Sequence, residues 1–368
     1  MKSRNLTLDI CKALAMIFII LIHVMQRSVN GFTTFWYSSL LLVLGVPIYF
    51  LVSGIAVNYR APLSPLGFVY DVFKRALMYM WPAVLFLLLR VWFYKVQPNF
   101  AMAFSEYMEY PSMGLWVLWL LVWYNALIDI ALLISYFLPK WKKLIVSITL
   151  VIAFTIFIIL REHGNIPSYH FIGYDYFVIY TPIFFVGYLL GDKIFAYVNK
   201  WASLIIMVLS LVGVILLTRF ATPFLSSGYH IEENLFIYYL GALLAVGFYY
   251  GISTLIERVK IGEPIALMGR FSLECYFLHL ILLRQWGRFD LGNGWLTALA
   301  TIGLTLLCIG NTVIVVAGTY FLPFTHFLLF GRHYSYYSFE NKMFDKLKEI
   351  ATKDYFHKSS DNINNITQ

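Results

Sequence analysis

Long apolar runs fill most of the chain, and short polar segments separate them. A helix that crosses a bilayer needs about 20 mostly apolar residues. Runs of about this length predict ten membrane spans, near residues 8–27, 35–58, 76–96, 114–137, 144–161, 174–191, 202–219, 234–253, 264–284 and 295–322. The pattern therefore predicts an all-α integral membrane protein, a bundle of about ten transmembrane helices.

The composition excludes an ordinary water-soluble domain. Hydrophobic residues make up 61% of the 368 residues and charged residues only 12%, whereas soluble domains carry about 25% charged residues. The cysteines Cys11, Cys275 and Cys308 all fall in apolar runs. Their spacing provides neither a disulfide framework nor a metal site, so we expect no bound metal.

Lysine and arginine residues gather in alternate loops, which sets the orientation by the positive-inside rule. With the N-terminus in the cytoplasm, that side also receives the basic tail. An even number of spans then puts both termini in the cytoplasm of a multi-pass cell-membrane protein. The same distribution accounts for the net charge of +8 without a nucleic-acid partner. The basic residues of that side, apart from the tail, are Lys2, Arg4, Arg60, Lys74, Arg75, Lys140, Lys142, Lys143, Lys193, Lys200, Arg258 and Lys260.

The chain changes character at about residue 331, where it becomes polar and basic. We therefore expect a transmembrane domain over 1–330 and a polar cytoplasmic tail over 331–368. The tail is too short to form a second domain.

Three ionisable side chains share one face of the first predicted helix. Asp9, Lys12 and His23 form the pattern D-x-x-K-x10-H. Eleven helical steps of about 100° return His23 to nearly the azimuth of Lys12, about 16 Å further along, and Asp9 can pair with Lys12. Ionisable groups in membrane helices are costly and usually functional. His23 is a candidate general base, and Lys12 a candidate anion ligand. The alternative is a histidine bonded to a neighbouring helix and a lysine that snorkels to the interface.

Two motifs follow near the second and third spans. Ser53 and Gly54, in GVPIYFLVSGIAV, permit a close backbone approach within an apolar helix. Lys74 and Arg75 begin the third span on the cytoplasmic side, where their charges suit phosphate groups. An ordinary positive-inside loop is the simpler explanation of these two residues.

The fourth span begins with a stripe of tryptophans, Trp116, Trp119 and Trp123, at helical spacing. Anchoring at the membrane interface is the simplest role for such residues. A wall for a sugar or acyl group at Trp116 is the functional alternative.

Polar residues recur on one face of the ninth predicted span. Ser272, Tyr276 and His279 lie at i, i+4 and i+7, and Arg270 and Glu274 add charge. So many polar groups on a membrane helix predict either a polar cavity or a network of hydrogen bonds between helices.

In this order the motifs resemble those of the acyltransferase 3 family of multipass membrane acyltransferases. That family shows D-G-L-R, ten residues and His in its first helix. The resemblance continues through VPIYFLVSGI at 46–55, Lys74-Arg75 before Pro82, and LWVLWLL at 115–121. It extends to YTPIFFVGYLLG at 180–191 and to FSLECYFLH at 271–279, which is similar to the family's S-L-G-x-Y-x-x-H.

The resemblance implies a membrane O-acyltransferase of about ten helices. Family members move an acyl group, commonly acetyl from cytoplasmic acetyl-CoA, to hydroxyls of surface carbohydrates, peptidoglycan or antibiotics. For this chain it implies acyl-CoA as co-substrate, no tightly bound cofactor, and a free or lipid-linked carbohydrate acceptor at the lipid bilayer. The implied roles are catalysis by His23, Lys12 and Asp9, donor binding by Lys74 and Arg75, and cavity lining by Ser53, Trp116, Ser272, Glu274, Tyr276 and His279.

The sequence departs from the family pattern at three positions. Lys12 stands where arginine is usual and lacks the bidentate fork, Met78 replaces a second arginine, and Glu274 replaces a small residue. Two other functions remain open on the residues alone. One is a transporter or flippase for a glycan precursor, which would also need intramembrane charges, and the other is a non-catalytic subunit of a polysaccharide-synthesis complex.

Overall fold

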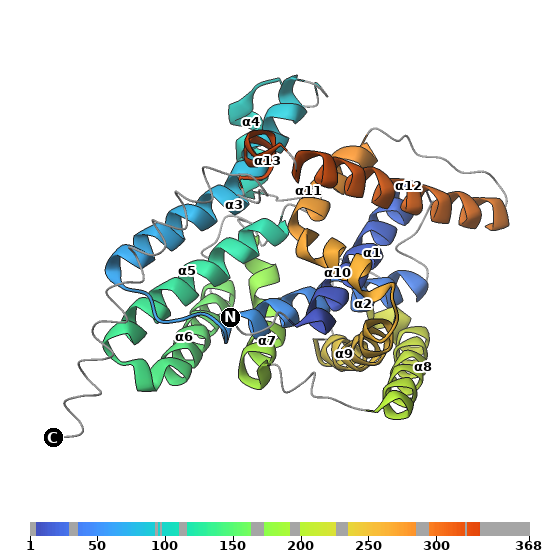
Figure 1. Cartoon of the computed structure of the whole chain (residues 1–368), viewed down its shortest axis with the longest axis horizontal. Coiled ribbons are helices and arrows are strands. Elements are labelled where there is room, and N and C mark those ends of the chain that lie inside the picture. Colours follow the sequence, from blue (N-terminus) through green and yellow to red (C-terminus); the bar gives the residue numbers. More distant parts are fainter. Residues whose placement is uncertain are drawn as a thin grey trace. The chain divides into compact units, whose positions relative to one another are not determined.

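A computed structural model describes residues 5–28, 36–92, 95, 98–109, 116–162, 173–191, 199–225, 235–284, 294–320 and 322–331. The predicted cytoplasmic tail, 331–368, lies outside these residues except for Gly331. The described residues are mostly helical and include no strand (Figure 1). The α-helices are α1 Leu6–Ser28, α2 Trp36–Val57, α3 Pro65–Trp92, α4 Phe100–Glu109, α5 Trp116–Phe137, α6 Lys142–Glu162, α7 Tyr174–Leu190, α8 Lys200–Leu225, α9 Leu235–Glu257, α10 Gly262–Arg270, α11 Ser272–Arg284, α12 Gly294–Tyr320 and α13 Pro323–Phe330.

Eight described helices are long and apolar enough to cross a membrane, which confirms the predicted all-α membrane protein. α10 and α11 add a ninth span if they are taken together, although the chain bends by 76° between them. The predicted count of ten is reached if the shorter apolar helix α7 also crosses.

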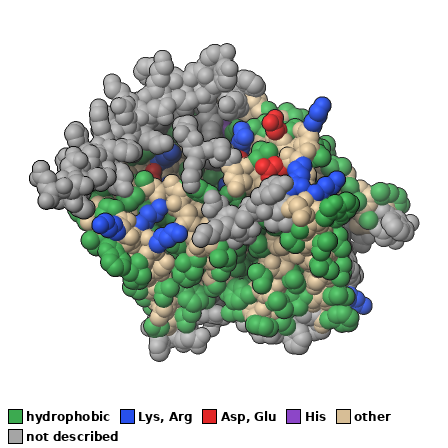
Figure 2. Space-filling view, turned by 60° about the horizontal axis from the view of Figure 1, so that its bottom comes forward, with side chains coloured by type: hydrophobic (Ala, Val, Ile, Leu, Met, Phe, Trp, Pro, Cys, Tyr) green, Lys and Arg blue, Asp and Glu red, His purple; other side chains and the backbone are tan. Residues whose placement is uncertain are grey.

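The outward faces of several helices are apolar, as a lipid environment requires. Figure 2 shows apolar side chains over much of the described surface in that view. On α6, Leu144, Ile148 and Ile152 are exposed, and on α8, Ile205 and Leu209 are exposed. In water, contiguous apolar faces of this kind would promote association, whereas lipid chains can cover them.

The helices form two compact units whose segments alternate along the chain. Unit 1 comprises Met1–Asn58 and Pro182–Val316, and within it α1 packs against α2, α9, α10 and α11, while α8 packs against α9. Unit 2 comprises Tyr59–Thr181 and Ala317–Gln368, and within it α5 packs against α3 and α6. The predicted membrane domain therefore contains two packing units.

Glycines let the backbones of α2 and α7 meet in unit 1. A Cβ atom at Gly54 would collide with the carbonyl oxygen of Phe184, and one at Gly187 would collide with that of Leu51. The close backbone approach predicted from Ser53-Gly54 is therefore confirmed, because only glycine provides the room.

A third glycine, Gly269, allows a close contact between α10 and α1. A Cβ atom at Gly269 would collide with the carbonyl oxygen of Asp9 and approach the backbone nitrogen of Ala13 to 3.2 Å. This contact sets where α10 ends on α1, and therefore where the chain bends at Phe271 into α11.

We expect Gly269→Ala to destabilise unit 1, because the added methyl group forces two helix backbones apart. Overpacking of this kind costs about 1–3 kcal/mol. The matched control is Gly303→Ala on α12, where a Cβ atom meets nothing within 4 Å, and where alanine favours the helix by about 0.5–1 kcal/mol. Thermal unfolding of both variants in detergent measures the difference. Equal melting temperatures would contradict the close α1–α10 contact.

Candidate active site

Two histidines from distant parts of the sequence meet in unit 1. Nδ1 of His23, on α1, lies 3.0 Å from Nε2 of His279, on α11. The two rings are nearly parallel, with centroids 5.1 Å apart. His279 is fully buried and His23 is half-buried. The structure thus joins two residues that the sequence singled out separately, and it gives His23 a partner on a neighbouring helix.

His279 makes a second hydrogen bond within its own helix. Its Nδ1 lies 3.1 Å from the carbonyl oxygen of Cys275, one turn earlier. The ring of Tyr276 approaches it edge-on, with the centroids 5.5 Å apart. Packing and two hydrogen bonds therefore define the orientation of the His279 ring.

The other polar residues predicted on α11 are also buried. Ser272, Glu274 and Tyr276 are all buried. Burial of three such groups beside His279 keeps the polar face of α11 away from lipid, where unsatisfied groups are costly. That these side chains line a substrate cavity stays a prediction.

Asp9 forms an ion pair at the junction between α1 and α10. Its carboxylate is buried, and Oδ2 lies 3.6 Å from Nε of Arg270. Lys12, one turn further along α1, is half-buried. The predicted pairing of Asp9 with Lys12 stays a prediction, and the sequence had not indicated Arg270 as a partner.

Ser53 has a local role in α2. Its hydroxyl donates to the carbonyl oxygen of Tyr49, one turn earlier, at 2.8 Å. This bond satisfies the hydroxyl inside an apolar helix.

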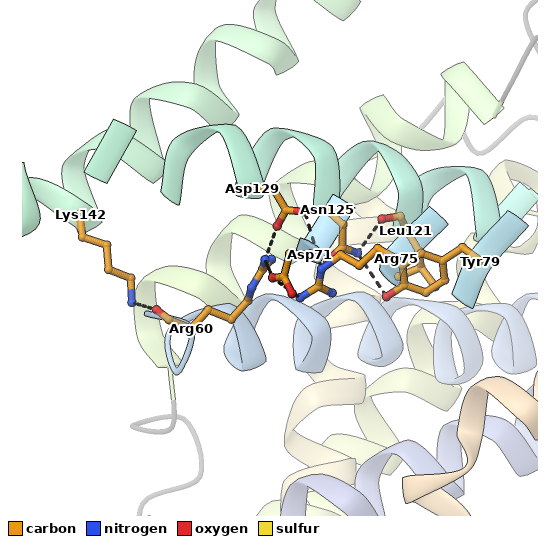
Figure 3. Close-up of polar contacts among 8 residues, drawn as sticks. All are labelled: Arg60, Asp71, Arg75, Tyr79, Leu121, Asn125, Asp129 and Lys142. Carbon is orange, nitrogen blue, oxygen red and sulfur yellow. Dashed lines mark hydrogen bonds and ion pairs between the residues drawn. The ribbon is translucent and has the colours of Figure 1, made fainter. Parts of the chain in front are cut away.

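A cluster of charged side chains lies in unit 2, where the segment before α3 meets α5 (Figure 3). The guanidinium group of Arg60 donates to Asp71 at 2.8 Å and also to Asp129. Arg75 lies 3.5 Å from Asp71 and 3.7 Å from Asp129. Lys142 donates to the carbonyl oxygen of Arg60. Two carboxylates therefore hold two guanidinium groups side by side.

Polar contacts continue along α3 and α5 beyond this cluster. The side-chain nitrogen of Asn125 donates to the hydroxyl of Tyr79 at 3.3 Å and to the carbonyl oxygen of Leu121 at 2.6 Å (Figure 3). Tyr79 lies one turn after Arg75 on α3, so the polar surface between the two helices extends further into the apolar span.

The adjacent residues Lys74 and Arg75 do not share a side of α3. Arg75 is half-buried against the carboxylates, whereas Lys74 is exposed, with its Nζ 5.8 Å from the ring centroid of Tyr70. Neighbouring helical residues point about 100° apart. Arg75 instead shares its two carboxylate partners with Arg60. The sequence interpretation had treated Arg60 as an ordinary loop residue.

Asp71 and Asp129 were also missed, although the sequence carries a signal for each. Asp129 is an ionisable residue inside an apolar run, and it is 1% exposed. Asp71 precedes Arg75 by four residues, the spacing of a helical ion pair. Both features indicate partners for Arg75.

Trp116 belongs to an aromatic stack in unit 2. Its ring centroid lies 4.1 Å from that of Tyr176 and 5.4 Å from that of Tyr180, and all three rings are nearly parallel. The stack fits an anchoring and packing role, and a substrate-facing role for Trp116 stays a prediction.

Buried ionisable side chains within a bundle of apolar helices define a polytopic membrane protein with polar sites inside its span. A family model described as an acyltransferase domain matches residues 5–338. The chain therefore belongs to the acyltransferase 3 family, as its motifs suggested, and it is a membrane acyltransferase. Comparisons with curated proteins and with solved structures return no match.

We expect Asp129→Asn to destabilise unit 2, because the buried carboxylate is shared by Arg60 and Arg75. Loss of a charged hydrogen-bond acceptor at such a position costs about 1–3 kcal/mol. Asp71→Asn is the comparison, and it should cost less because Asp71 is 19% exposed against 1% for Asp129. Thermal unfolding in detergent ranks the two variants, and the reverse order would contradict the central position of Asp129.

Proposed function

We propose that this acyltransferase moves an acyl group, most simply acetyl, from cytoplasmic acyl-CoA to a hydroxyl of a cell-surface or exported carbohydrate. The observation that carries the proposal is the half-buried imidazole of His23, hydrogen-bonded to His279 within a family of acyltransferases. An imidazole is the side chain best suited to accept a proton near neutral pH. Removal of that proton makes the acceptor oxygen a competent nucleophile.

The two neighbouring guanidinium groups of unit 2 support the proposal that the acyl donor is anionic. The guanidinium groups of Arg60 and Arg75 lie against the same two carboxylates, and guanidinium groups bind phosphate through paired hydrogen bonds. We propose that these two arginines, with the exposed Lys74, bind the phosphates of acyl-CoA. Asp71 and Asp129 then serve to keep the two like charges together when the donor is absent.

The proposed reaction needs no bound cofactor. The acceptor O–H bond breaks as its oxygen bonds to the acyl carbon, and His23 holds the proton. The carbon–sulfur bond then breaks, and the leaving CoA thiolate takes the proton from His23. In this scheme Lys12 provides positive charge for the donor, and Asp9 fixes the neighbouring helix through Arg270.

The remaining predicted residues suit the acceptor side of the reaction. We propose that Ser53, Ser272, Glu274 and Tyr276, all in unit 1, offer hydrogen bonds to sugar hydroxyls. For unit 2 we propose separately that Trp116 offers a ring face to a sugar or acyl group. Aromatic faces and a few polar groups are both typical of small-molecule sites. From the basic loops we propose that the protein lies in the cell membrane with both termini in the cytoplasm, the side on which acyl-CoA would be available.

We expect His23→Ala to lower O-acetylation of surface carbohydrate by at least about 100-fold, the usual contribution of a general base. Mass spectrometry of surface glycans from a deletion strain carrying each variant measures the effect. The matched control is Gln26→Ala, an exposed position on the same helix, which should acetylate normally. Normal acetylation by correctly inserted His23→Ala would contradict the role of His23. Movement of a glycan precursor without acylation would favour a transporter.

We expect Arg75→Gln and Arg60→Gln to raise the KM for acetyl-CoA about 10- to 100-fold, because a hydrogen bond between charged groups contributes about 1.5–3 kcal/mol. Transfer of labelled acetyl groups by purified protein gives KM and kcat separately. Lys74→Gln is the control, and its effect should be smaller because the Lys74 side chain is exposed, whereas that of Arg75 is half-buried. An unchanged KM in Arg75→Gln would contradict donor binding at this cluster.

A further inference from the structure

In the histidine pair, each ring donates a hydrogen bond from its Nδ1: His279 to a backbone carbonyl oxygen, and His23 to His279. The first lies between His279 Nδ1 and the carbonyl oxygen of Cys275, at 3.1 Å. A carbonyl oxygen can only accept a hydrogen bond, so Nδ1 of His279 carries a proton. His279 is fully buried, and burial of a positive charge is costly. The ring is therefore neutral, and its Nε2 carries a lone pair.

That lone pair faces His23. His279 Nε2 lies 3.0 Å from His23 Nδ1, and because Nε2 accepts, His23 Nδ1 must donate. Neutral His23, the form that can act as a base, therefore carries its proton on Nδ1 and its lone pair on Nε2. One backbone carbonyl on α11 thus determines the tautomer of a ring on α1, through His279.

We infer that His279 is a positioning residue that fixes the tautomer and orientation of His23, so that Nε2 of His23 is the atom that accepts the acceptor's proton. The role of His23 as a base rests on the proposed function, whereas its tautomer does not. His279 takes the place that a carboxylate holds in a serine–histidine–aspartate triad. It offers a neutral acceptor in place of a charged one.

The same bond stabilises the protonated form of His23 during the reaction. When Nε2 has taken the proton, His23 is a cation, and its Nδ1–H bond to His279 becomes charge-assisted and stronger. The proton then leaves from Nε2 to the CoA thiolate, and the pair returns to its starting state. His279 exchanges no proton in this cycle, since its own proton stays on Nδ1, which donates a hydrogen bond to the Cys275 carbonyl oxygen.

Three replacements of His279 separate positioning from mere packing. In His279→Gln the amide oxygen extends about as far as Nε2 and can accept from His23. In His279→Asn the amide is shorter and can bond only near the Cys275 carbonyl. His279→Leu fills the space without any acceptor. Gln and Asn are both buried amides, so they form a matched pair that differs in reach.

We expect kcat to fall at least about 100-fold in the Asn and Leu variants and to stay within about 10-fold of wild type in Gln. Loss of the orienting partner of a catalytic histidine costs up to about 10⁴ in kcat. The KM for acetyl-CoA should change little in all three, because the partner acts on the base. Wild-type kcat in His279→Leu would overturn the inference, and so would a kcat in Gln as low as in Asn.

Nitrogen NMR of histidine-labelled protein in detergent tests the tautomer without any turnover. The His23 signals are assigned by their loss in His23→Gln. We expect protonated Nδ1 and unprotonated Nε2 in wild type, and a shift to the commoner Nε2–H form in His279→Leu. Protonated Nε2 in the wild type would overturn the inference. The expected tautomer in a protein that transfers no acyl group would support the assignment of the bond and contradict the proposed function instead.

Discussion

The contact between the backbones of α1 and α10 at Gly269 is the constraint on which the histidine pair depends. It brings α10 against the helical turn of α1 that contains Asp9. The Asp9–Arg270 ion pair stabilises the same contact. The chain then bends at Phe271 and α11 begins. His279, two turns into α11, reaches His23 only because that starting point is fixed. The geometry of the histidine pair is thus set by a position at which a side chain has no room.

Charged groups in both units are handled by pairing within the protein. In unit 2, Asp129 and Asp71 neutralise Arg60 and Arg75, and in unit 1 Asp9 meets Arg270. Charges that are removed from water are costly to leave unpaired, so each of these groups gains from a partner in the protein. In unit 2 the pairing also holds Arg60 and Arg75 close together, which is the arrangement that the proposed binding of an anionic donor requires.

The sequence alone predicted the features that depend on local pattern. Hydropathy located the spans, and Ser53-Gly54 indicated the close approach of another backbone. The order of the motifs identified the family. The sequence did not predict the pairing of His23 with His279, because 256 residues separate them and no periodicity relates positions on different helices. Arg60 was missed because the positive-inside rule already explained it. Lys74 was grouped with Arg75 by adjacency, although adjacent residues on a helix face different directions.

The alternation of the two units along the chain has a consequence for biosynthesis. The histidine pair cannot form until residue 279 has left the ribosome, and at about 5–20 residues per second the 256 intervening residues take roughly 13–50 s. During that interval α1 must reside in the bilayer with Asp9, Lys12 and His23 but without α10 or α11. Its stable insertion therefore depends on snorkelling, on local water, or on an insertase that shelters it until the partner helices arrive.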